Sequence, residues 1–177
     1  MNLPNRLTLL RIIAIPFFIF FLMTDFISFS KWIAFGLFIM ASLTDFLDGY
    51  IARKKNLVTD FGKFADPLAD KLLVCSALIC LLSLGKISVY IVLIIIARDF
   101  IISGFRLVAA GKGIVIAADW SGKIKTALQM VMILFIIADI PFFAIFTLVL
   151  EIVVVALTVI SLVECLIKNS KVLKEEK

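Results

Sequence analysis

Four aspartates at helical spacings are the residues of this sequence best suited to chemistry. Asp45 and Asp48 are three positions apart, and Asp66 and Asp70 are four apart, so each pair shares one face of a helix. Carboxylates held this close repel one another unless a cation lies between them. Oxygen ligands without histidine or thiolate favour Mg²⁺ or Mn²⁺. The pattern therefore predicts that the aspartates share two metal ions, an arrangement suited to in-line displacement at phosphorus.

The composition of the chain is that of an integral membrane protein. Of its 177 residues, 63% are hydrophobic and only 18% are charged, against about 25% charged in soluble domains. Cys75, Cys80 and Cys165 lie in apolar runs without CxxC spacing, and histidine is absent, which argues against a zinc site and for buried, inert thiols. The net charge of +5 indicates membrane topology and inner-leaflet contact, and not a nucleic-acid partner.

The apolar runs predict an all-α fold with six transmembrane helices. Most uncharged runs have only 11 to 14 residues, whereas a spanning helix needs about 20 predominantly apolar residues. Each crossing must therefore include charged residues, and these normally face a bundle interior or a wet cavity. We predict helices at residues 6–24, 32–53, 61–84, 87–109, 122–139 and 143–167.

The lysines and arginines predict the topology of these helices. With the N-terminus in the cytoplasm, only Lys31 and Lys86 of the 18 basic residues lie on the outer side, which is a strong positive-inside pattern. The aspartates and the basic residues of the later helices then lie at the inner end. We predict a single multi-pass domain in the cell membrane, residues 1–177, with a polar cavity that opens to the cytoplasm and a charged tail at 168–177.

The aspartates belong to a longer pattern that also contains glycine, alanine and arginine, Asp45-x2-Asp48-Gly49-x2-Ala52-Arg53-x8-Gly62-x3-Asp66-x3-Asp70. Without any departure, this pattern resembles the motif of the CDP-alcohol phosphatidyltransferase family. The resemblance implies a six-helix membrane fold, usually dimeric. It also implies a reaction in which an acceptor hydroxyl attacks the lipid-side phosphorus of a CDP-linked lipid and CMP leaves.

The same resemblance implies a role for each motif residue. Asp45, Asp48, Asp66 and Asp70 would bind the metal ions, and Asp70 would also be the base for the acceptor hydroxyl. The CDP site would be formed by Asp48, Gly49, Ala52, Arg53 and Gly62, with Asn5 and Thr8 from the N-terminal segment. The chemistry agrees, because a pyrophosphate needs divalent cations and, without histidine, a carboxylate is the available base.

A second group of charges indicates the nature of the acceptor. Arg98 and Arg106 are eight residues apart, which is close to two helical turns. Lys123 and Lys125 open the next predicted helix, where backbone N–H groups also favour an anion. These four cations favour an acceptor that carries its own phosphate. Positive-inside anchoring is the alternative for the same side chains, and Asp99 is available to pair with a neighbouring cation.

Three further stretches resemble one branch of the family, the bacterial phosphatidylglycerophosphate synthases. They are NLPNRLTLLR at the N-terminus, the segment from Ala97 to Arg106, and GKIKT at 122–126. This resemblance implies CDP-diacylglycerol as the donor, sn-glycerol 3-phosphate as the acceptor and phosphatidylglycerophosphate as the product. That branch often has glutamate where this chain has Asp99, which is a mild departure.

Other functions remain open from the sequence. The acceptor of the same reaction could be phosphatidylglycerol, serine or an inositol phosphate, of which only the last would use the second group of cations. A divalent-cation transporter would need carboxylates along the whole membrane crossing, whereas these cluster at one end and Glu151 is the one deeper candidate. A non-catalytic scaffold would release no CMP.

Overall fold

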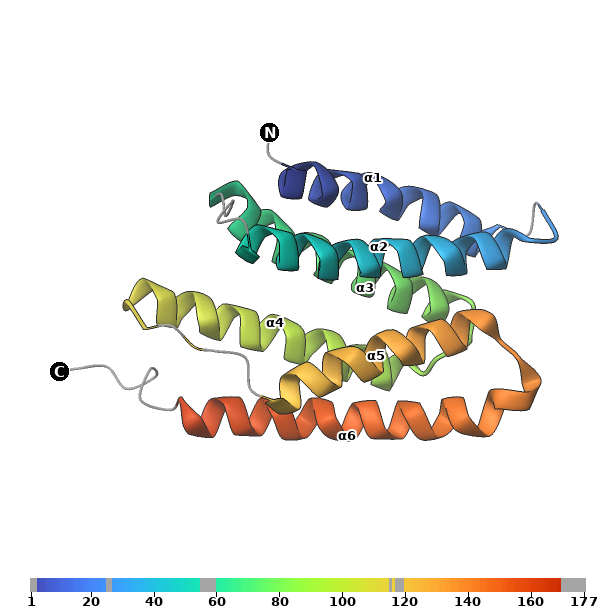
Figure 1. Ribbon diagram of the computed structural model, residues 1–177. Coiled ribbons are helices and arrows are strands. Elements are labelled where there is room, and N and C mark those ends of the chain that lie inside the picture. The colour runs from blue at the N-terminus through green and yellow to red at the C-terminus, as the bar shows by residue number, and fades with distance from the viewer. Residues whose placement is uncertain (1–2, 25–26, 55–59, 115, 117–119, 170–177) are drawn as a thin grey trace. The chain divides into compact units, whose positions relative to one another are not determined.

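The part of the chain that the computed structural model describes is all-α and contains no strand (Figure 1). It comprises the backbone of residues 3–24, 27–54, 60–114, 116 and 120–169, and their side chains except those of 3–6, 45–54 and 60–66. The predicted helices are all present as helices, with ends within three residues of the prediction. The elements are α1 (Leu3–Met23), α2 (Ser30–Lys54), α3 (Asp60–Ser83), α4 (Val89–Gly111), α5 (Trp120–Ala138), the 3₁₀ helix η1 (Pro141–Phe143) and α6 (Ala144–Lys168).

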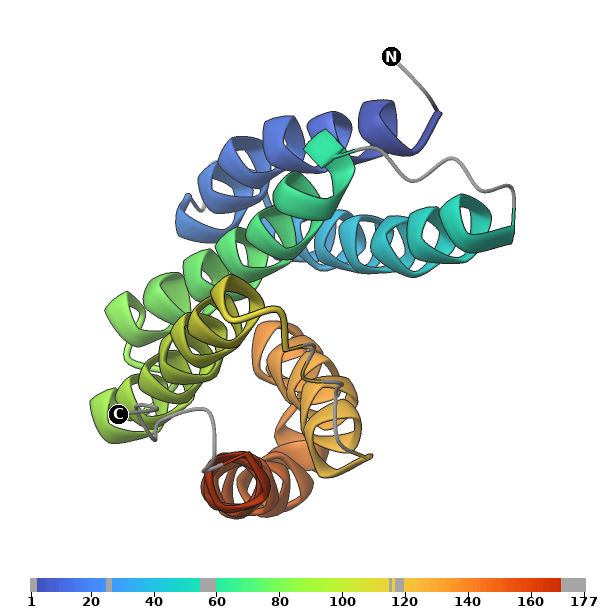
Figure 2. The ribbon, with the colours of Figure 1, turned by 90° about the vertical axis from the view of Figure 1, so that its left-hand side faces the viewer.

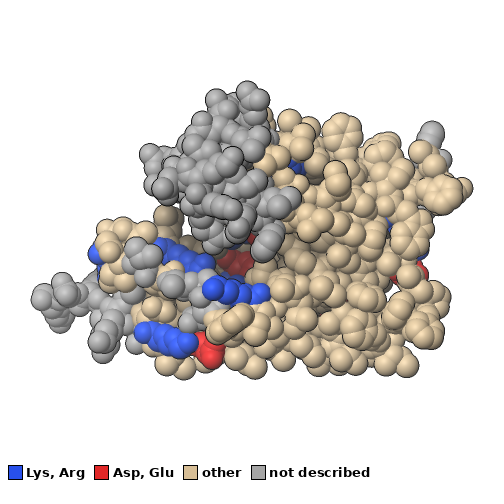
Figure 3. All heavy atoms as spheres, viewed as in Figure 1, with Lys and Arg blue, Asp and Glu red and all other residues tan. Residues whose placement is uncertain are grey.

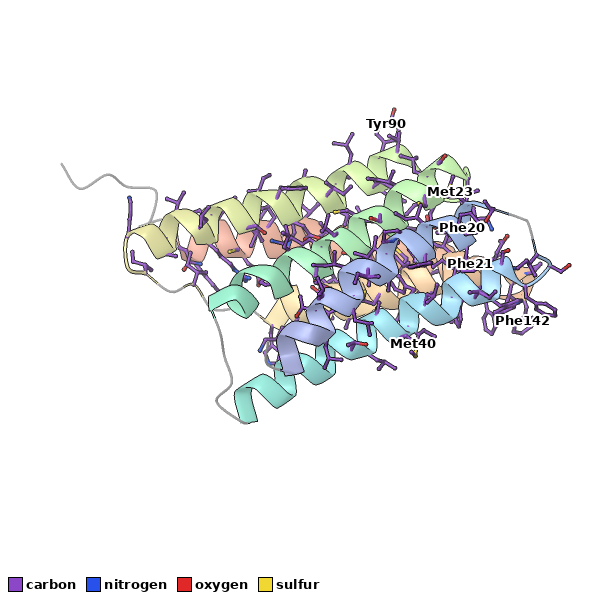
Figure 4. All side chains as sticks on the ribbon, turned by 90° about the horizontal axis from the view of Figure 1, so that it is seen from above. Phe20, Phe21, Met23, Met40, Tyr90 and Phe142 are labelled. Carbon is purple, nitrogen blue, oxygen red and sulfur yellow. The ribbon has the colours of Figure 1, made fainter. Side chains whose placement is uncertain are left out.

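Two segments of the described chain are long and apolar enough to cross a membrane. They are Trp120–Ala138 and Pro141–Lys168. Shorter apolar segments, Leu7–Met23 and Ser30–Thr44, lie in the first two helices. Figure 4 shows side chains such as those of Met40 and Phe142 projecting from their helices, and these two are 68% and 86% exposed. Extensive exposed apolar surface of this kind is rare in soluble monomers and suits a membrane.

The chain divides into two compact units. The first unit consists of Met1–Ile87 and Ile133–Ile140, so it holds α1, α2, α3 and the end of α5. The second unit consists of Ser88–Met132 and Pro141–Lys177, with α4, most of α5, η1 and α6. The predicted aspartate site lies in the first unit, and the predicted phosphate-binding cations lie in the second.

Close packing of α1 against α2 and α3 builds the first unit (Figures 1 and 2). The rings of Phe18 and Phe38 lie 5.7 Å apart between centroids, and both side chains are buried. Ala34 and Ala41 are also buried on α2, and small side chains let helix backbones approach. On α3 the buried face recurs every four residues, at Ala69, Leu73, Ala77 and Leu81. These contacts fix the helices that carry the aspartates.

Two lysines form hydrogen bonds with residues at the end of α5, at one end of the first unit. The ammonium of Lys31 donates to the carbonyl of Ala138, and that of Lys86 donates to Oδ2 of Asp139, both at 2.8 Å. Asp139 has a φ of 47°, in the left-handed region that aspartate tolerates better than most residues. The two lysines predicted on the outer side therefore connect the end of α5 to the rest of the first unit.

Contacts between α4 and α6 form an apolar core in the second unit. Ile102, Phe105 and Ala109 of α4 pack with Cys165 of α6. Helix α4 ends at Gly111. Gly113, two residues later, has a φ of 73°, and the N–H of Ile114 donates to the carbonyl of Ala109 at 2.9 Å in the manner of a Schellman cap. Cys165 is buried and is a free thiol, as the sequence predicted.

The packed ring of Phe18 gives a test of the first unit. We expect Phe18→Ala to destabilise the detergent-solubilised protein by on the order of 3 kcal/mol, because it leaves a cavity between two helices. Phe20→Ala is the matched control, since Phe20 is 55% exposed. Thermal unfolding followed by circular dichroism measures both, and equal melting temperatures for the two variants would contradict the packing.

The ion pair at the end of α5 predicts a pH dependence. The hydrogen bond from Lys86, with the charges of Lys86 and Lys31, holds the pKa of Asp139 below its usual value of 3.8. The stabilisation is therefore present at neutral pH and is lost as the pH falls through the lowered pKa. Because the side chain of Asp139 is 63% exposed, we expect the ion pair to stabilise the fold by less than about 1 kcal/mol.

Asp139→Asn is the appropriate variant, since asparagine also tolerates the left-handed backbone. The melting temperature of this variant should lie below that of the unsubstituted protein from about pH 5 to pH 7, and the gap should close at lower pH. A gap that persists after the carboxylate is protonated would show that the ion pair is not its cause.

Candidate functional site

The four predicted metal-binding aspartates lie on two helices of the first unit that contact each other. Asp45 and Asp48 are in the second half of α2, and Asp66 and Asp70 are in the first half of α3. Helical backbone at these positions puts each pair on one face, as predicted. The side chains of Asp45, Asp48 and Asp66 lie outside the described residues, so their metal-binding role stays a prediction.

Asp70 is the one member of the set whose side chain is described. It is half-buried and interacts with a neighbouring group. Among the described side chains there is no cluster of three or more histidines, cysteines or acidic residues that could hold a metal ion. The four-aspartate set supplies only carboxylate oxygens, and that donor chemistry fits Mg²⁺ or Mn²⁺.

The residues predicted to bind CDP lie on three helices of the first unit. Gly49, Ala52 and Arg53 belong to α2 and Gly62 to α3, and their side-chain surroundings, like those of Asn5, lie outside the described residues. Thr8 of α1 is fully buried and interacts with a neighbouring group. A buried hydroxyl on α1 is therefore present in the unit that carries the aspartates.

Arg11 is a buried charged residue to which the sequence analysis gave no role. Its side chain is 2% exposed, and Nε donates to the carbonyl of Ala41 on α2 at 3.2 Å. Ala41 precedes Asp45 by one helical turn. The signal was available, because Arg11 lies one turn after Thr8 on the same face of an apolar helix. Its guanidinium ties α1 to the segment of α2 that leads into the aspartates.

An apolar groove of about 300 Å³ runs along α1 and α2. Thr44, which lines it, directly precedes Asp45 in the chain. The groove suits the hydrocarbon part of a ligand whose polar part would reach the aspartates. Its other lining residues are Leu10, Arg11, Ile13, Ala14, Phe17, Leu37, Met40 and Ala41.

In the second unit, Asp99 joins two of the four predicted phosphate-binding cations. Oδ1 of Asp99 accepts a hydrogen bond from Nη1 of Arg98 at 3.0 Å and one from Nζ of Lys125 at 2.8 Å. The side chains of Lys125, Arg98 and Asp99 are 1%, 12% and 20% exposed. The pairing left open for Asp99 is therefore observed. We call Arg98, Asp99, Lys125 and Ser161 the α4–α6 polar cluster.

Ser161 of α6 completes this cluster. Its hydroxyl accepts hydrogen bonds from Nε and Nη2 of Arg98, at 3.2 and 3.0 Å. A Cβ added to Gly122 would lie 3.2 Å from Nη2, so the start of α5 passes close to the guanidinium. Three helices therefore meet at Arg98. The sequence analysis identified Arg98 only by its position in an apolar run and did not predict these contacts.

Arg106 and Lys123 are arranged differently. Both are exposed, and the ammonium of Lys123 lies 5.8 Å from the ring centroid of Trp120, within cation–π range. Figure 3 shows lysine and arginine side chains gathered over the end of the second unit where α4 ends and α5 begins. The structure thus brings Arg98 and Lys125 together, while the side chains of Arg106 and Lys123 are exposed.

Further polar groups lie near the cluster along α5 and α6. The hydroxyl of Ser121 donates to Oε2 of Glu164. Gln129, one turn after Lys125, is 3% exposed, and among the described residues its Oε1 has no hydrogen-bond partner. The second unit therefore contains a buried polar region among otherwise apolar helices. The sequence analysis did not identify Ser161, Gln129 or Glu164, because single polar residues in apolar runs carry no spacing signal.

Comparison with known proteins supports the family that the aspartate pattern indicates. A family model described as CDP-alcohol phosphatidyltransferase matches residues 1–163. The chain is 48% identical to the CDP-diacylglycerol–glycerol-3-phosphate 3-phosphatidyltransferase of Bacillus subtilis, over 73% of each chain. It is 47% identical to the protein of that name from Rickettsia bellii, over 73% of this chain and 71% of that one. It is 40% identical to a probable phosphatidylglycerophosphate synthase of Mycobacterium tuberculosis, over 75% of this chain and 64% of that one.

The aspartate set predicts that divalent ions stabilise the folded chain. We expect Mg²⁺ or Mn²⁺ to raise the melting temperature of the purified protein, with a gain of about 2.7 kcal/mol at an ion concentration 100 times the dissociation constant. Asp70→Asn should remove most of that gain, and Asp139→Asn, which alters a carboxylate outside the set, should keep it. An equal gain in all three proteins would contradict ion binding at the aspartates.

Proposed function

The chain belongs to the CDP-alcohol phosphatidyltransferase family, and from that premise we propose that it transfers a phosphatidyl group from CDP-diacylglycerol to sn-glycerol 3-phosphate. The products are CMP and phosphatidylglycerophosphate. The observation that carries the proposal is the family match across residues 1–163, which includes the complete aspartate pattern. Relatives at 45% identity or more that are named for this reaction support the choice of acceptor.

The aspartates would hold the donor. Asp45, Asp48, Asp66 and Asp70 would hold two Mg²⁺ or Mn²⁺ ions, which would offset the charge of the pyrophosphate and polarise its phosphoryl oxygens. Gly49, Ala52 and Gly62 leave room for the nucleotide beside the helix backbones, and Arg53 offers a guanidinium to a phosphate. Asn5 and Thr8 complete the CDP site from α1. The acyl chains stay in hydrocarbon, and the groove along α1 and α2 can take part of one chain.

The transfer needs one proton acceptor and one leaving group. A hydroxyl of the acceptor attacks the lipid-side phosphorus, the new phosphorus–oxygen bond forms, and the bond to the CMP oxygen breaks. Asp70 takes the proton of the attacking hydroxyl, because a carboxylate is the base that this histidine-free chain can supply. The CMP phosphate leaves with the electron pair of the broken bond, so the charges and atoms balance.

The acceptor phosphate would be bound by the cations of the second unit. Arg98 and Lys125, held together by Asp99, are the central pair, and the exposed side chains of Arg106 and Lys123 guide the anion toward them. Arginine matches the geometry of a phosphate with its planar fork. Phosphatidylglycerol and serine leave these cations without a phosphomonoester partner, and an inositol phosphate is the acceptor that would also use them.

The reaction would take place at a membrane. All six long helices cross the cell membrane, as the positive-inside distribution of lysine and arginine indicates, and the polar cavity opens to the cytoplasm, where glycerol 3-phosphate and CMP are soluble. Residues 1–177 form one functional domain, which acts as a homodimer in keeping with the family. A divalent-cation transporter is the alternative of another class.

The direct test is CMP release by the purified protein with CDP-diacylglycerol and Mg²⁺. We expect release only when sn-glycerol 3-phosphate is added, and not with phosphatidylglycerol, serine or inositol phosphate added in its place. Asp70→Asn should lower the rate at least about 100-fold, since general base catalysis alone contributes that much. Asp139→Asn is the matched carboxylate control and should retain the rate.

The same assay separates the alternatives. Release that depends on a different acceptor would keep the metal site and overturn the assignment of the cations. Absence of release from folded protein under every condition would overturn the enzyme proposal. Mn²⁺ uptake into vesicles that contain the protein would then favour transport.

A further inference from the structure

We propose that Asp99 is a positioning residue that holds Arg98 and Lys125 ready for the phosphate of the acceptor. The inference rests on the proposed function and adds to it a residue that makes no contact with substrate. The argument stands on the hydrogen bonds, burial and charge of the α4–α6 polar cluster.

The geometry makes Asp99 the link between two helices. A single atom, its Oδ1, accepts from Nη1 of Arg98 on α4 and from Nζ of Lys125 on α5. Neighbouring cations would otherwise repel each other, and long basic side chains have many rotamers to lose. The shared oxygen overcomes the repulsion and fixes both head groups before any ligand arrives, which is the usual route to tighter binding.

The remaining contacts restrict Arg98 further. Nε and Nη2 donate to the hydroxyl of Ser161 on α6, so three of the five guanidinium N–H groups have partners in the cluster. The other two N–H groups, one on Nη1 and one on Nη2, make no hydrogen bond within the cluster and can donate to a phosphate. Ser161 is 2% exposed, so its hydroxyl is a fixed anchor for Arg98.

The charge of the cluster also fits an acceptor that is an anion. Arg98, Asp99 and Lys125 together carry one net positive charge when all are ionised. Burial makes an unpaired ammonium costly, and the carboxylate at 2.8 Å compensates the ammonium of Lys125, which is 1% exposed. Without the carboxylate of Asp99, the cluster would lose the atom that accepts from both Arg98 and Lys125, and either head group could turn away from the site.

Steady-state kinetics of the full-length protein can test this role. Asp99→Asn keeps the size of the side chain and removes its charge. We expect it to raise the KM for sn-glycerol 3-phosphate by about 10-fold or more, which corresponds to the loss of charge-assisted hydrogen bonds. The KM for CDP-diacylglycerol should change less than about 2-fold, because the donor uses groups of the other unit. Asp99→Glu, which restores the carboxylate, should recover at least half of the lost acceptor affinity on a logarithmic scale.

Glu164→Gln is the matched control. It neutralises a carboxylate in the same unit whose partner is a hydroxyl, that of Ser121, and it should leave the KM for sn-glycerol 3-phosphate unchanged. If Asp99→Asn does not fold, Ser161→Ala decides the question. That variant removes the second anchor of Arg98 and should also raise the acceptor KM selectively.

The outcomes separate this inference from the function on which it depends. If the unsubstituted protein shows no CMP release with glycerol 3-phosphate, the proposed function itself fails. If the unsubstituted protein is active and Asp99→Asn has an unchanged acceptor KM, only the positioning role of Asp99 is wrong. Equal rises in the KM values of donor and acceptor, with no rescue by Asp99→Glu, would make Asp99 a purely structural residue and would also overturn the inference.

Discussion

An ionised side chain inside an apolar helix bundle needs a partner of opposite charge, and this constraint organises the molecule. Asp99 meets it by bonding to both Arg98 and Lys125. The carbonyl of Ala41 compensates the guanidinium of Arg11 in part, because it accepts a hydrogen bond from Nε. A charge without such a partner would destabilise the fold by several kcal/mol. Charges therefore survive in these helices where a neighbouring residue or a ligand compensates them, and such places are where chemistry can occur.

The same constraint gives each unit its part in the proposed reaction. In the first unit, four aspartates lie at helical spacings on α2 and α3, and in the proposed reaction they suit metal ions that carry a pyrophosphate. In the second unit, Arg98 and Lys125 exceed the single charge of Asp99, so the cluster suits an anion. In the proposed reaction, the acyl chains of the donor stay in the membrane, beside the apolar surface of α1, α2, η1 and α6.

The sequence predicted the helices well because their apolar runs end at charged residues or at glycines such as Gly85 and Gly113, which adopt left-handed backbone. It also predicted that the aspartates lie on helices, because the spacing within each pair is local; their metal-binding role stays a prediction. It did not predict that Arg98 and Lys125 meet at Asp99, because Lys125 lies 26 positions from Asp99. It also did not predict the bond from Arg98 to Ser161, 63 positions away, since both contacts depend on how the helices pack. Arg11 was missed for the same reason, since its bond to Ala41 joins two helices. Nor did the spacing of Arg98 and Arg106 reveal that the side chain of Arg98 is only 12% exposed whereas that of Arg106 is exposed.

The measurement that tests the central claim most directly is phosphorus NMR of the lipid formed from CDP-diacylglycerol and sn-glycerol 3-phosphate. Transfer predicts a lipid with one phosphodiester and one phosphomonoester in equal amounts, together with CMP. Phosphatidic acid as the lipid product, with the glycerol 3-phosphate unchanged, would mean that water is the nucleophile. That result would contradict the account, because the cations of the second unit would then have no acceptor to hold.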